Sequence, residues 1–164
     1  MFYIELERCR CELIVDGFCG VGGNAIQFAF TCERVIAIDI DPKKIEMAKH
    51  NAGFHHPIFS KINTFLAIYG VEDRIEFIVG DYFKIIPSLR PDVVFLSPPW
   101  GGPAYLDQDI FDLEDMGGMD GLEIYRVAKE RTDNIAYFVP RYELKLSVLT
   151  KNFLEIQIQP SWRG

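Results

Sequence analysis

The chain has 164 residues, of which 49% are hydrophobic, 25% are charged and 13% are aromatic. This composition predicts one folded domain with a sizeable core and excludes an intrinsically disordered chain. No stretch reaches the roughly 18–20 apolar residues of a membrane span, and the first residues lack the pattern of a secretion signal, so we expect a soluble intracellular protein. The net charge of −7 excludes a protein that follows a nucleic-acid backbone over many phosphates, because such proteins are basic. Any contact with nucleic acid is therefore expected at a small terminal feature.

All four cysteines lie in the first fifth of the chain, at Cys9, Cys11, Cys19 and Cys32. The spacing of Cys9 and Cys11 is not that of a zinc site, and no histidine follows at a suitable distance. We therefore expect reduced thiols packed around the first strand and its turn, rather than metal ligands or a disulfide.

A short apolar run, residues 12–16, ends in Asp16 and leads at once into a glycine-rich turn over residues 17–23. Residues 24–30 then have the pattern of a helix that begins at Asn24. Strand, glycine-rich turn and helix are the first unit of a doubly wound nucleotide-binding fold. The glycines run G-x-G-G rather than G-x-G-x-x-G, so the turn does not indicate a dinucleotide, and an ordinary tight turn would use the same residues.

The second predicted strand, residues 34–39, also ends in an acid. Asp39 follows the glycine turn by about 20 residues, the spacing at which a carboxylate accepts hydrogen bonds from the hydroxyls of a ribose. A ribose-binding acid without a pyrophosphate-binding loop favours S-adenosylmethionine over NAD. Asp41 and Pro42 instead predict the start of a helix over residues 43–51, with Asp41 as its N-cap.

Residues 53–66 form an apolar stretch with two adjacent histidines, which we interpret as an insertion without metal ligands. The third predicted strand, residues 74–81, ends in Gly80-Asp81. The Asp81 carboxylate can accept the amino group of an adenine, or it can simply begin a turn. Three strands thus end at or beside an acid, at the edge where parallel α/β sheets bind ligands.

The fourth predicted strand, residues 91–96, runs directly into Ser97-Pro98-Pro99-Trp100-Gly101-Gly102-Pro103. Because the prolines fix the backbone and remove N–H donors, carbonyl groups are held in place beside an indole face. This arrangement suits a flat base that carries an amino group. The other interpretation is a cis-proline turn that closes the strand, with Trp100 in the core.

The rest of the chain continues the same pattern. Residues 105–118 predict a mobile loop, residues 122–131 a helix, and residues 134–139 a fifth strand that brings Arg141 to the same edge. The Arg141 guanidinium can bind phosphate with two nitrogens, or it can form a surface salt bridge. After a helical stretch around residues 142–149, residues 153–159 predict a last strand.

Taken together, these motifs resemble the class I S-adenosylmethionine-dependent methyltransferases and, among them, the trimethylguanosine synthase family. The segments that carry the resemblance are residues 15–24, 35–42, 93–103 and 137–141. The resemblance implies an α/β fold with a doubly wound, mostly parallel Rossmann-like sheet, in a single methyltransferase domain over residues 1–164. It implies conversion of the 7-methylguanosine cap of small nuclear and nucleolar RNAs to the 2,2,7-trimethyl form. S-Adenosyl-L-methionine is the implied cofactor and capped RNA the implied partner of a monomer, with no metal and no membrane, in the nucleus (nucleolus or Cajal body) and the cytoplasm.

The resemblance also implies roles for individual residues. Those implied to bind the cofactor are Asp16, Phe18, Cys19, Gly20, Gly22, Asn24, Asp39, Ile40 and Asp81. The Ser97 hydroxyl and the Pro98 carbonyl would accept N–H bonds from the guanine amino group and turn its nitrogen toward the methyl donor. Trp100 would stack on the methylated, cationic guanine, Asn51 would help to position the base, and Arg141 would contact the cap phosphates.

The chain departs from the family pattern in three places. Little sequence precedes the first strand, the 53–66 insertion directly follows Asn51, and the strand at 153–159 is expected to be one half of a C-terminal antiparallel pair. We therefore expect the terminal elements of the family to be truncated. Two alternatives stay open: amino-group methylation of an internal base of RNA or DNA, and a catalytically impaired cap-binding fragment.

Overall fold

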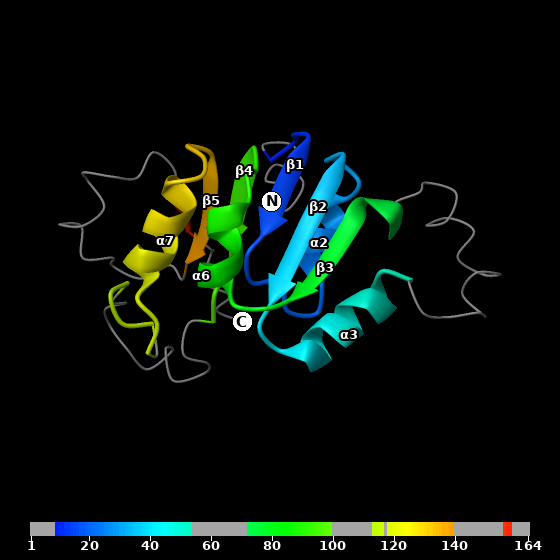
Figure 1. The fold of residues 1–164 in the computed structure, drawn as a ribbon, viewed down its shortest axis with the longest axis horizontal. Coiled ribbons are helices and arrows are strands. Elements are labelled where there is room, and N and C mark those ends of the chain that lie inside the picture. Colours follow the sequence, from blue (N-terminus) through cyan, green and yellow to red (C-terminus); the bar gives the residue numbers. More distant parts are fainter. Residues whose placement is uncertain (1–8, 54–71, 100–112, 117, 140–155, 159–164) are drawn as a thin grey trace, which may run out of the picture.

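The computed structural model describes residues 9–53, 72–99, 113–116, 118–139 and 156–158, which form one sheet with helices on both faces (Figure 1). The strands are β1 (Leu13–Asp16), β2 (Arg34–Asp39), β3 (Ile75–Val79), β4 (Val93–Leu96), β5 (Ile135–Val139) and β6 (Ile156–Ile158). The helices are α2 (Gly23–Phe28), α3 (Pro42–Asn51), α6 (Tyr82–Ile85) and α7 (Gly121–Lys129), with 3₁₀ turns η1 (Glu72–Arg74) and η2 (Ile86–Ser88). The predicted elements in these ranges are confirmed, with ends that shift by one or two residues for most of them.

The strand order is β3-β2-β1-β4-β5-β6, and each neighbouring pair runs parallel. The chain builds β1, β2 and β3 outward in one direction and then returns to place β4 on the other side of β1. This reversal is the topological switch point, beside which doubly wound sheets bind their ligands. The predicted Rossmann-like sheet is therefore confirmed.

The predicted last strand is present, and it pairs in parallel with β5. Tyr137 lies opposite Ile156 and Val139 opposite Ile158, and the described residues hold no antiparallel partner for β6. A parallel neighbour needs a crossover of a dozen or more residues, and residues 140–155 between the two strands are enough for one.

The core lies in two layers because successive strand residues point to opposite faces of the sheet. One face packs against α2 and α3 through residues that include Ile14, Val35, Ala37, Val93 and Phe95. The other face packs against α6, η2 and α7 through residues that include Val15, Ile36, Ile38, Val94 and Leu96. The central strands therefore read as continuous apolar runs, as expected for a parallel sheet that is covered on both sides.

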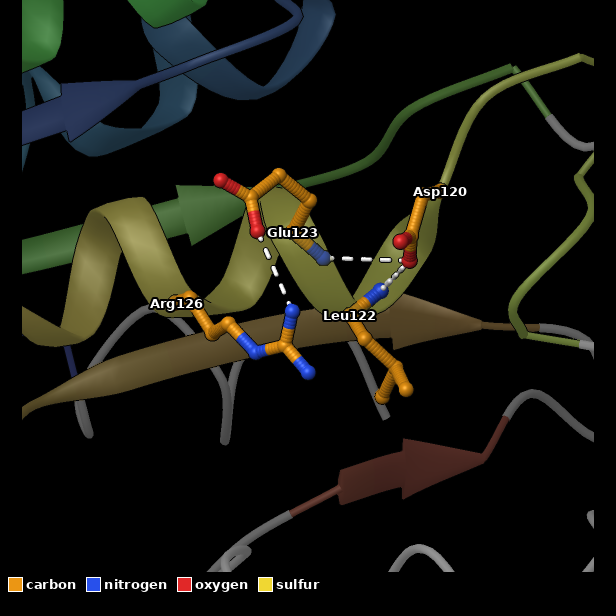
Figure 2. A network of polar contacts seen from close by, with 4 residues as sticks. All are labelled: Asp120, Leu122, Glu123 and Arg126. Carbon is orange, nitrogen blue, oxygen red and sulfur yellow. Dashed lines mark hydrogen bonds and ion pairs between the residues drawn. The ribbon is translucent and has the colours of Figure 1, made fainter.

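Two helices begin at aspartates that bind free backbone amides. The Asp41 Oδ1 accepts a hydrogen bond from Lys43 N at 2.9 Å, so the predicted N-cap of α3 is confirmed. Asp120 Oδ1 accepts bonds from Leu122 N at 2.8 Å and Glu123 N at 3.1 Å at the start of α7 (Figure 2). Each such cap satisfies amides that have no partner within the helix.

Helix α2 begins differently, and the prediction that Asn24 opens it was wrong. Its first residue is Gly23, and the N-cap is Gly22 in a left-handed conformation with φ of 86° and no capping side chain. The glycine turn itself feeds the chain into the helix, so a side-chain cap is replaced by a backbone conformation that glycine adopts readily.

The cysteines are free thiols, as predicted, with three of them buried and Cys11 half-buried. Cys32 Sγ donates to Cys9 O at 3.2 Å, and Cys11 Sγ lies 3.9 Å from Cys32 Sγ. Burial raises the pKa of Cys11 and of Cys19 well above the usual range, which makes both thiols poor nucleophiles.

Several predicted segments lie outside the described residues: nearly all of the 53–66 insertion, most of the 105–118 loop and the 142–149 stretch. Within the described ranges, no helix is both long and apolar enough to span a bilayer.

Candidate functional site

The carboxyl edge of the sheet brings the predicted acids and Ser97 together. Asp16 lies opposite Ala37 on β2 and opposite Phe95 on β4, and Gly17 N donates to Phe95 O at 3.0 Å. Asp39 lies opposite Val79, two residues before Asp81. The edge therefore presents Asp81, Asp39, Asp16 and Ser97 in that spatial order, from β3 across the switch point to β4.

Backbone amides of the glycine turn bind the end of β2, one through a main-chain carbonyl and one through a carboxylate. Cys19 N donates to Ile38 O at 2.8 Å, and Gly20 N donates to Asp39 Oδ2 at 2.9 Å. Gly22 N closes the turn by donating to Cys19 O at 2.9 Å. The turn after β1 therefore leans toward β2, and its position depends on the Asp39 carboxylate.

Two glycines of this turn leave no room for a side chain. A Cβ on Gly22 would lie 2.9 Å from Ala48 Cβ on α3, and the φ of +86° is itself unfavourable for other residues. A Cβ on Gly17 would lie 2.9 Å from the ring of Tyr82 on α6. The turn is thus wedged between two helices, which fixes its shape before any ligand arrives.

Asp39 and Asp81 have hydrogen-bond partners in the protein. Asp39 Oδ1 accepts from Asp41 N at 2.9 Å and Oδ2 accepts from Gly20 N, so both carboxylate oxygens are oriented by backbone amides. Each oxygen keeps a second lone pair for a ligand hydroxyl. Asp81 Oδ1 accepts from Phe83 N at 3.0 Å as the N-cap of α6. This is the turn-starting role, and the adenine contact of Asp81 stays a prediction.

Asp16 differs from both, because it is fully buried and its two carboxylate oxygens accept no hydrogen bond in the described part of the chain. Burial raises the pKa of Asp16 to about 7, and the nearby charge of Asp39 adds to the rise. The amides of Phe18 and Ala25 lie close enough to offset part of it, without reaching hydrogen-bond geometry. A buried, unpartnered carboxylate is costly, so this position favours a ligand that brings a donor or a positive charge.

Exposed apolar side chains flank the acids at the ends of β2 and β3. Ile40 is 72% exposed, Val79 is 50% exposed and Phe83 is 37% exposed. They lie beside carboxylates that can bind hydroxyl or amino groups, an arrangement that suits a flat heterocycle on a sugar. Ile40 was predicted as a site residue, but Val79 and Phe83 were missed, since an apolar residue at the end of a buried strand or in a short helix looks like core.

The ring of Phe18, in the glycine turn, stacks on the ring of Tyr82 on α6, with centroids 4.9 Å apart. Tyr82 is buried and its hydroxyl donates to Ile124 O on α7 at 2.8 Å. Tyr82 was not predicted either, and its role is to hold the turn and α7 in place.

The Ser-Pro-Pro corner leaves β4 next to the glycine turn. Ser97 is half-buried, and its hydroxyl has no hydrogen-bond partner within the described residues. Pro98 is buried, and the peptide bonds before Pro98 and Pro99 are trans, so the cis-proline interpretation was wrong. A free hydroxyl and a carbonyl held by prolines are both available as hydrogen-bond acceptors.

Two asparagines complete the described site. Asn51 ends α3, and its Nδ2 donates to Val21 O at 2.9 Å, which ties the helix to the glycine turn. Asn24 is half-buried near the start of α2. Their predicted ligand contacts stay predictions. Trp100 and Arg141, predicted to bind the base and the phosphates, lie outside the described residues.

The model of a known family, the RNA cap guanine-N2 methyltransferases, matches residues 11–159 of this chain. The chain belongs to this family. It is similar to the trimethylguanosine synthase of Schizosaccharomyces pombe, with 40% identity over 136 residues that cover 79% of this chain and 51% of that protein. It is 35% identical over 145 residues to the trimethylguanosine synthase of Saccharomyces cerevisiae, covering 85% of this chain and 42% of that protein.

Solved structures show the same fold in other methyltransferases. An rRNA methylase from Streptococcus thermophilus matches with a TM-score of 0.51 and 14% identity, over 83% of this chain and 69% of that one. This cap methyltransferase family member therefore has the class I methyltransferase sheet. It spans about half the length of the two trimethylguanosine synthases, so its own activity is a matter for proposal.

Proposed function

We propose that this chain transfers a methyl group from S-adenosylmethionine to the N2 amino group of a 7-methylguanosine RNA cap, which gives 2,7-dimethyl- or 2,2,7-trimethylguanosine. Family membership supports this proposal. The observation that carries it is the register of β1 and β4, with Asp16 opposite Phe95, because this register places the acid-ended glycine turn beside Ser97 and Pro98. The turn proposed to bind the cofactor and the corner proposed to bind the base therefore lie at one switch point of the sheet.

The described residues fit the cofactor group by group. S-Adenosylmethionine carries cationic groups, a ribose and an adenine, and when bound it supplies a methyl group on a sulfonium with a neutral leaving group. Asp16 offers a buried carboxylate that has no partner among the described residues, and Asp39 offers oriented oxygens for ribose hydroxyls. The exposed side chains of Ile40, Val79 and Phe83 offer an apolar surface for adenine.

The residues proposed to contact the substrate contribute by positioning its amino group. Ser97 Oγ and the Pro98 carbonyl accept the two N–H bonds of the guanine amino group, which orients the nitrogen for attack. Positioning of this kind is worth several orders of magnitude in rate, and a sulfonium leaving group reduces the need for a strong base. The amino group gives up one proton to solvent for each methyl group that it gains.

Selection of the methylated cap falls to Trp100 in this proposal. The 7-methylguanine ring is cationic, so stacking on an indole adds a cation–π attraction to the ordinary stacking energy. Arg141 would contact the cap phosphates with its guanidinium fork. A single aromatic residue and one arginine suit an acidic protein that binds only the end of an RNA. In this proposal the protein is a monomer. Its substrates are capped small RNAs, and it acts on them in the nucleus.

The decisive experiment is mass spectrometry of a 7-methylguanosine cap analogue after incubation with the protein and S-adenosylmethionine. We expect one or two added methyl groups on the guanine N2. Cofactor binding without methyl transfer would favour the impaired cap-binding fragment, and methylation of an uncapped RNA or DNA at an internal base would favour the other alternative.

Replacement of Trp100 tests how the cap is selected. Loss of about 1–3 kcal/mol of stacking predicts roughly 5- to 150-fold weaker cap binding for Trp100→Ala. The matched control is Trp162→Ala, at the only other tryptophan of the chain, which should keep the affinity of the unaltered protein. Cap affinity that does not change in Trp100→Ala, measured by calorimetry, would remove Trp100 from the site.

A further inference from the structure

Asp16 is the buried acid of the candidate site, and what we infer from it rests on the proposed function because S-adenosylmethionine is taken as the ligand. Asp16 is 0% exposed, and both of its oxygens lack a hydrogen-bond partner in the described ranges. The other acids at this edge differ, since Asp39 and Asp81 bind backbone amides. Among the carboxyl groups of the described edge, Asp16 is thus the one that requires a ligand to supply its hydrogen-bond donor or counter-charge.

We propose that binding of the cofactor expels a proton from Asp16, so that the affinity of the site for S-adenosylmethionine rises with pH through neutrality. In the free protein, burial away from water favours the neutral form of the carboxyl, and the nearby amides of Phe18 and Ala25 offset this only in part. When the cationic part of the cofactor lies beside it, the ionised form is favoured, and the carboxyl proton passes to solvent.

The charged and titratable surroundings of Asp16 support this direction. Asp39 on β2 places a negative charge nearby, which opposes a second charge in the free site. Cys19 in the turn stays a neutral thiol, because burial and the nearby charges of Asp16 and Asp39 raise its pKa. The charge of Lys44 on α3 acts on Cys19 rather than on Asp16. Among the described residues, the free site therefore has no cation that holds Asp16 ionised.

The pKa of Asp16, raised to about 7 by burial, sets the pH window. Below that value the cofactor must displace a proton, and above it the carboxylate is already ionised. Because affinity follows the ionised fraction of the free site, we expect binding roughly five- to tenfold weaker at pH 6 than at pH 7.5. The α-ammonium of the cofactor, with a pKa of about 8, stays mostly protonated over this range.

The test is isothermal titration with S-adenosylhomocysteine, which keeps the ammonium and lacks the sulfonium, and with S-adenosylmethionine. Titrations at pH 6.5 in buffers of different ionisation enthalpy count the protons released. We expect roughly half a proton or more per ligand bound by the unaltered protein and none by Asp16→Asn. Asp133→Asn is the matched control, because Asp133 is exposed and paired with Lys129 at 2.8 Å, and it should release as much as the unaltered protein.

The outcomes separate the inference from the proposed function. Cofactor binding without proton release, or equal release by Asp16→Asn, would overturn the inference and leave the cofactor assignment intact. Absence of any cofactor binding would overturn both. Release with S-adenosylmethionine alone would assign the effect to the sulfonium, and release with both ligands to the ammonium, and either result supports the proton exchange.

A second measurement covers the case in which Asp16→Asn does not fold. Carbon-detected NMR of the side-chain carboxyl in the unaltered protein follows the Asp16 titration directly. We expect a midpoint near neutrality in the free protein and a clearly lower midpoint with S-adenosylhomocysteine bound. An Asp16 signal that titrates below about pH 5 in the free protein, close to the range of an ordinary carboxyl, would overturn the inference.

Discussion

The two ends of the β1–β4 strand pair contrast in how they satisfy their polar groups. At the amino end, Asp92 uses three groups: its carboxylate accepts from Leu13 N at 2.8 Å, its amide donates to Leu13 O at 2.9 Å, and its carbonyl accepts from Thr132 Oγ1 at 2.8 Å and Asn134 Nδ2 at 3.0 Å. At the carboxyl end, Asp16 and the Ser97 hydroxyl have no hydrogen-bond partner within the described residues. The polar groups of Asp92 at the amino end are therefore hydrogen-bonded within the protein, whereas those of Asp16 and Ser97 at the carboxyl end are not bonded by any described residue.

The molecule gains stability at the amino end of this strand pair and gives stability up at the carboxyl end. Hydrogen bonds at the amino end fix the relative positions of β1, β4 and the start of β5. The carboxyl end keeps a buried acid without a partner in the described chain and large apolar side chains in solvent, both of which cost free energy in the absence of a ligand. Such costs are typical of binding sites, where stability is exchanged for function.

The largest expected effect is a gain in stability on neutralising Asp16. Its pKa is raised from 3.8 in an exposed chain to about 7 in the fold. The contribution of Asp16 to stability is therefore most favourable below pH 4, falls as pH rises toward 7, and falls no further above that pH. A pKa difference of about three between the folded and unfolded chain corresponds to about 4 kcal/mol. Asp16→Asn should thus be more stable than the unaltered protein at pH 8, and the gain should vanish at pH 4.

Chemical denaturation at these two pH values measures that effect, and Asp39→Asn is its matched control. The Asp39 carboxylate accepts two backbone hydrogen bonds, so the same change there should lower the free energy of unfolding by about 1–3 kcal/mol. Equal destabilisation by both variants at pH 8 would show that the Asp16 carboxylate has hydrogen-bond partners in the free protein. The two ends of the strand pair would then not differ in this respect.

A second, smaller effect tests whether the shape of the open end is built in advance. Gly22→Ala combines a φ of +86° with a Cβ 2.9 Å from Ala48 Cβ, so we expect a loss of about 2–3 kcal/mol in the free energy of unfolding. Gly23→Ala is the control, because nothing lies within 4 Å of its Cβ position and its φ is not in the strained range. Thermal unfolding should be unchanged or slightly improved in the control.

Some features of these two ends could be predicted from the sequence and others could not. The strands, the acids that end β1 and β2 and the cap at Asp41 were predicted correctly, since each depends on a local pattern of apolar runs and helix-starting residues. The parallel pairing of β6 with β5 could not be predicted, because the direction of a strand is set by the crossover that precedes it rather than by the strand itself. The start of α2 was predicted wrongly because the backbone of Gly22 takes the place of a capping side chain.

The character of each acid could not be predicted from the sequence either. Asp16 and Asp39 follow similar apolar strands, yet Asp39 receives the amides of Gly20 and Asp41 whereas Asp16 receives none in the described chain. Which acid is satisfied depends on the direction in which the glycine turn leans, and that direction is a property of the assembled fold. The exposure of Val79 and Phe83 has the same origin, since it depends on which helices cover the ends of β2 and β3.

The smallest expected effect compares one residue from each end. Asp92→Ala removes the acceptor of the Leu13 amide and should lower the free energy of unfolding by about 0.5–1.5 kcal/mol, a modest loss because the bond is exposed to water. The affinity of Asp92→Ala for S-adenosylhomocysteine should not change.

Ser97→Ala should affect activity and not stability. Its thermal midpoint should stay unchanged, since the Ser97 hydroxyl binds nothing in the described chain, and its turnover of a cap analogue should fall several-fold. Thermal unfolding, calorimetry and single-turnover assays on both variants measure these differences. If Asp92→Ala weakened cofactor binding, or if Ser97→Ala unfolded more easily, stability and binding would not be divided between the two ends of the sheet.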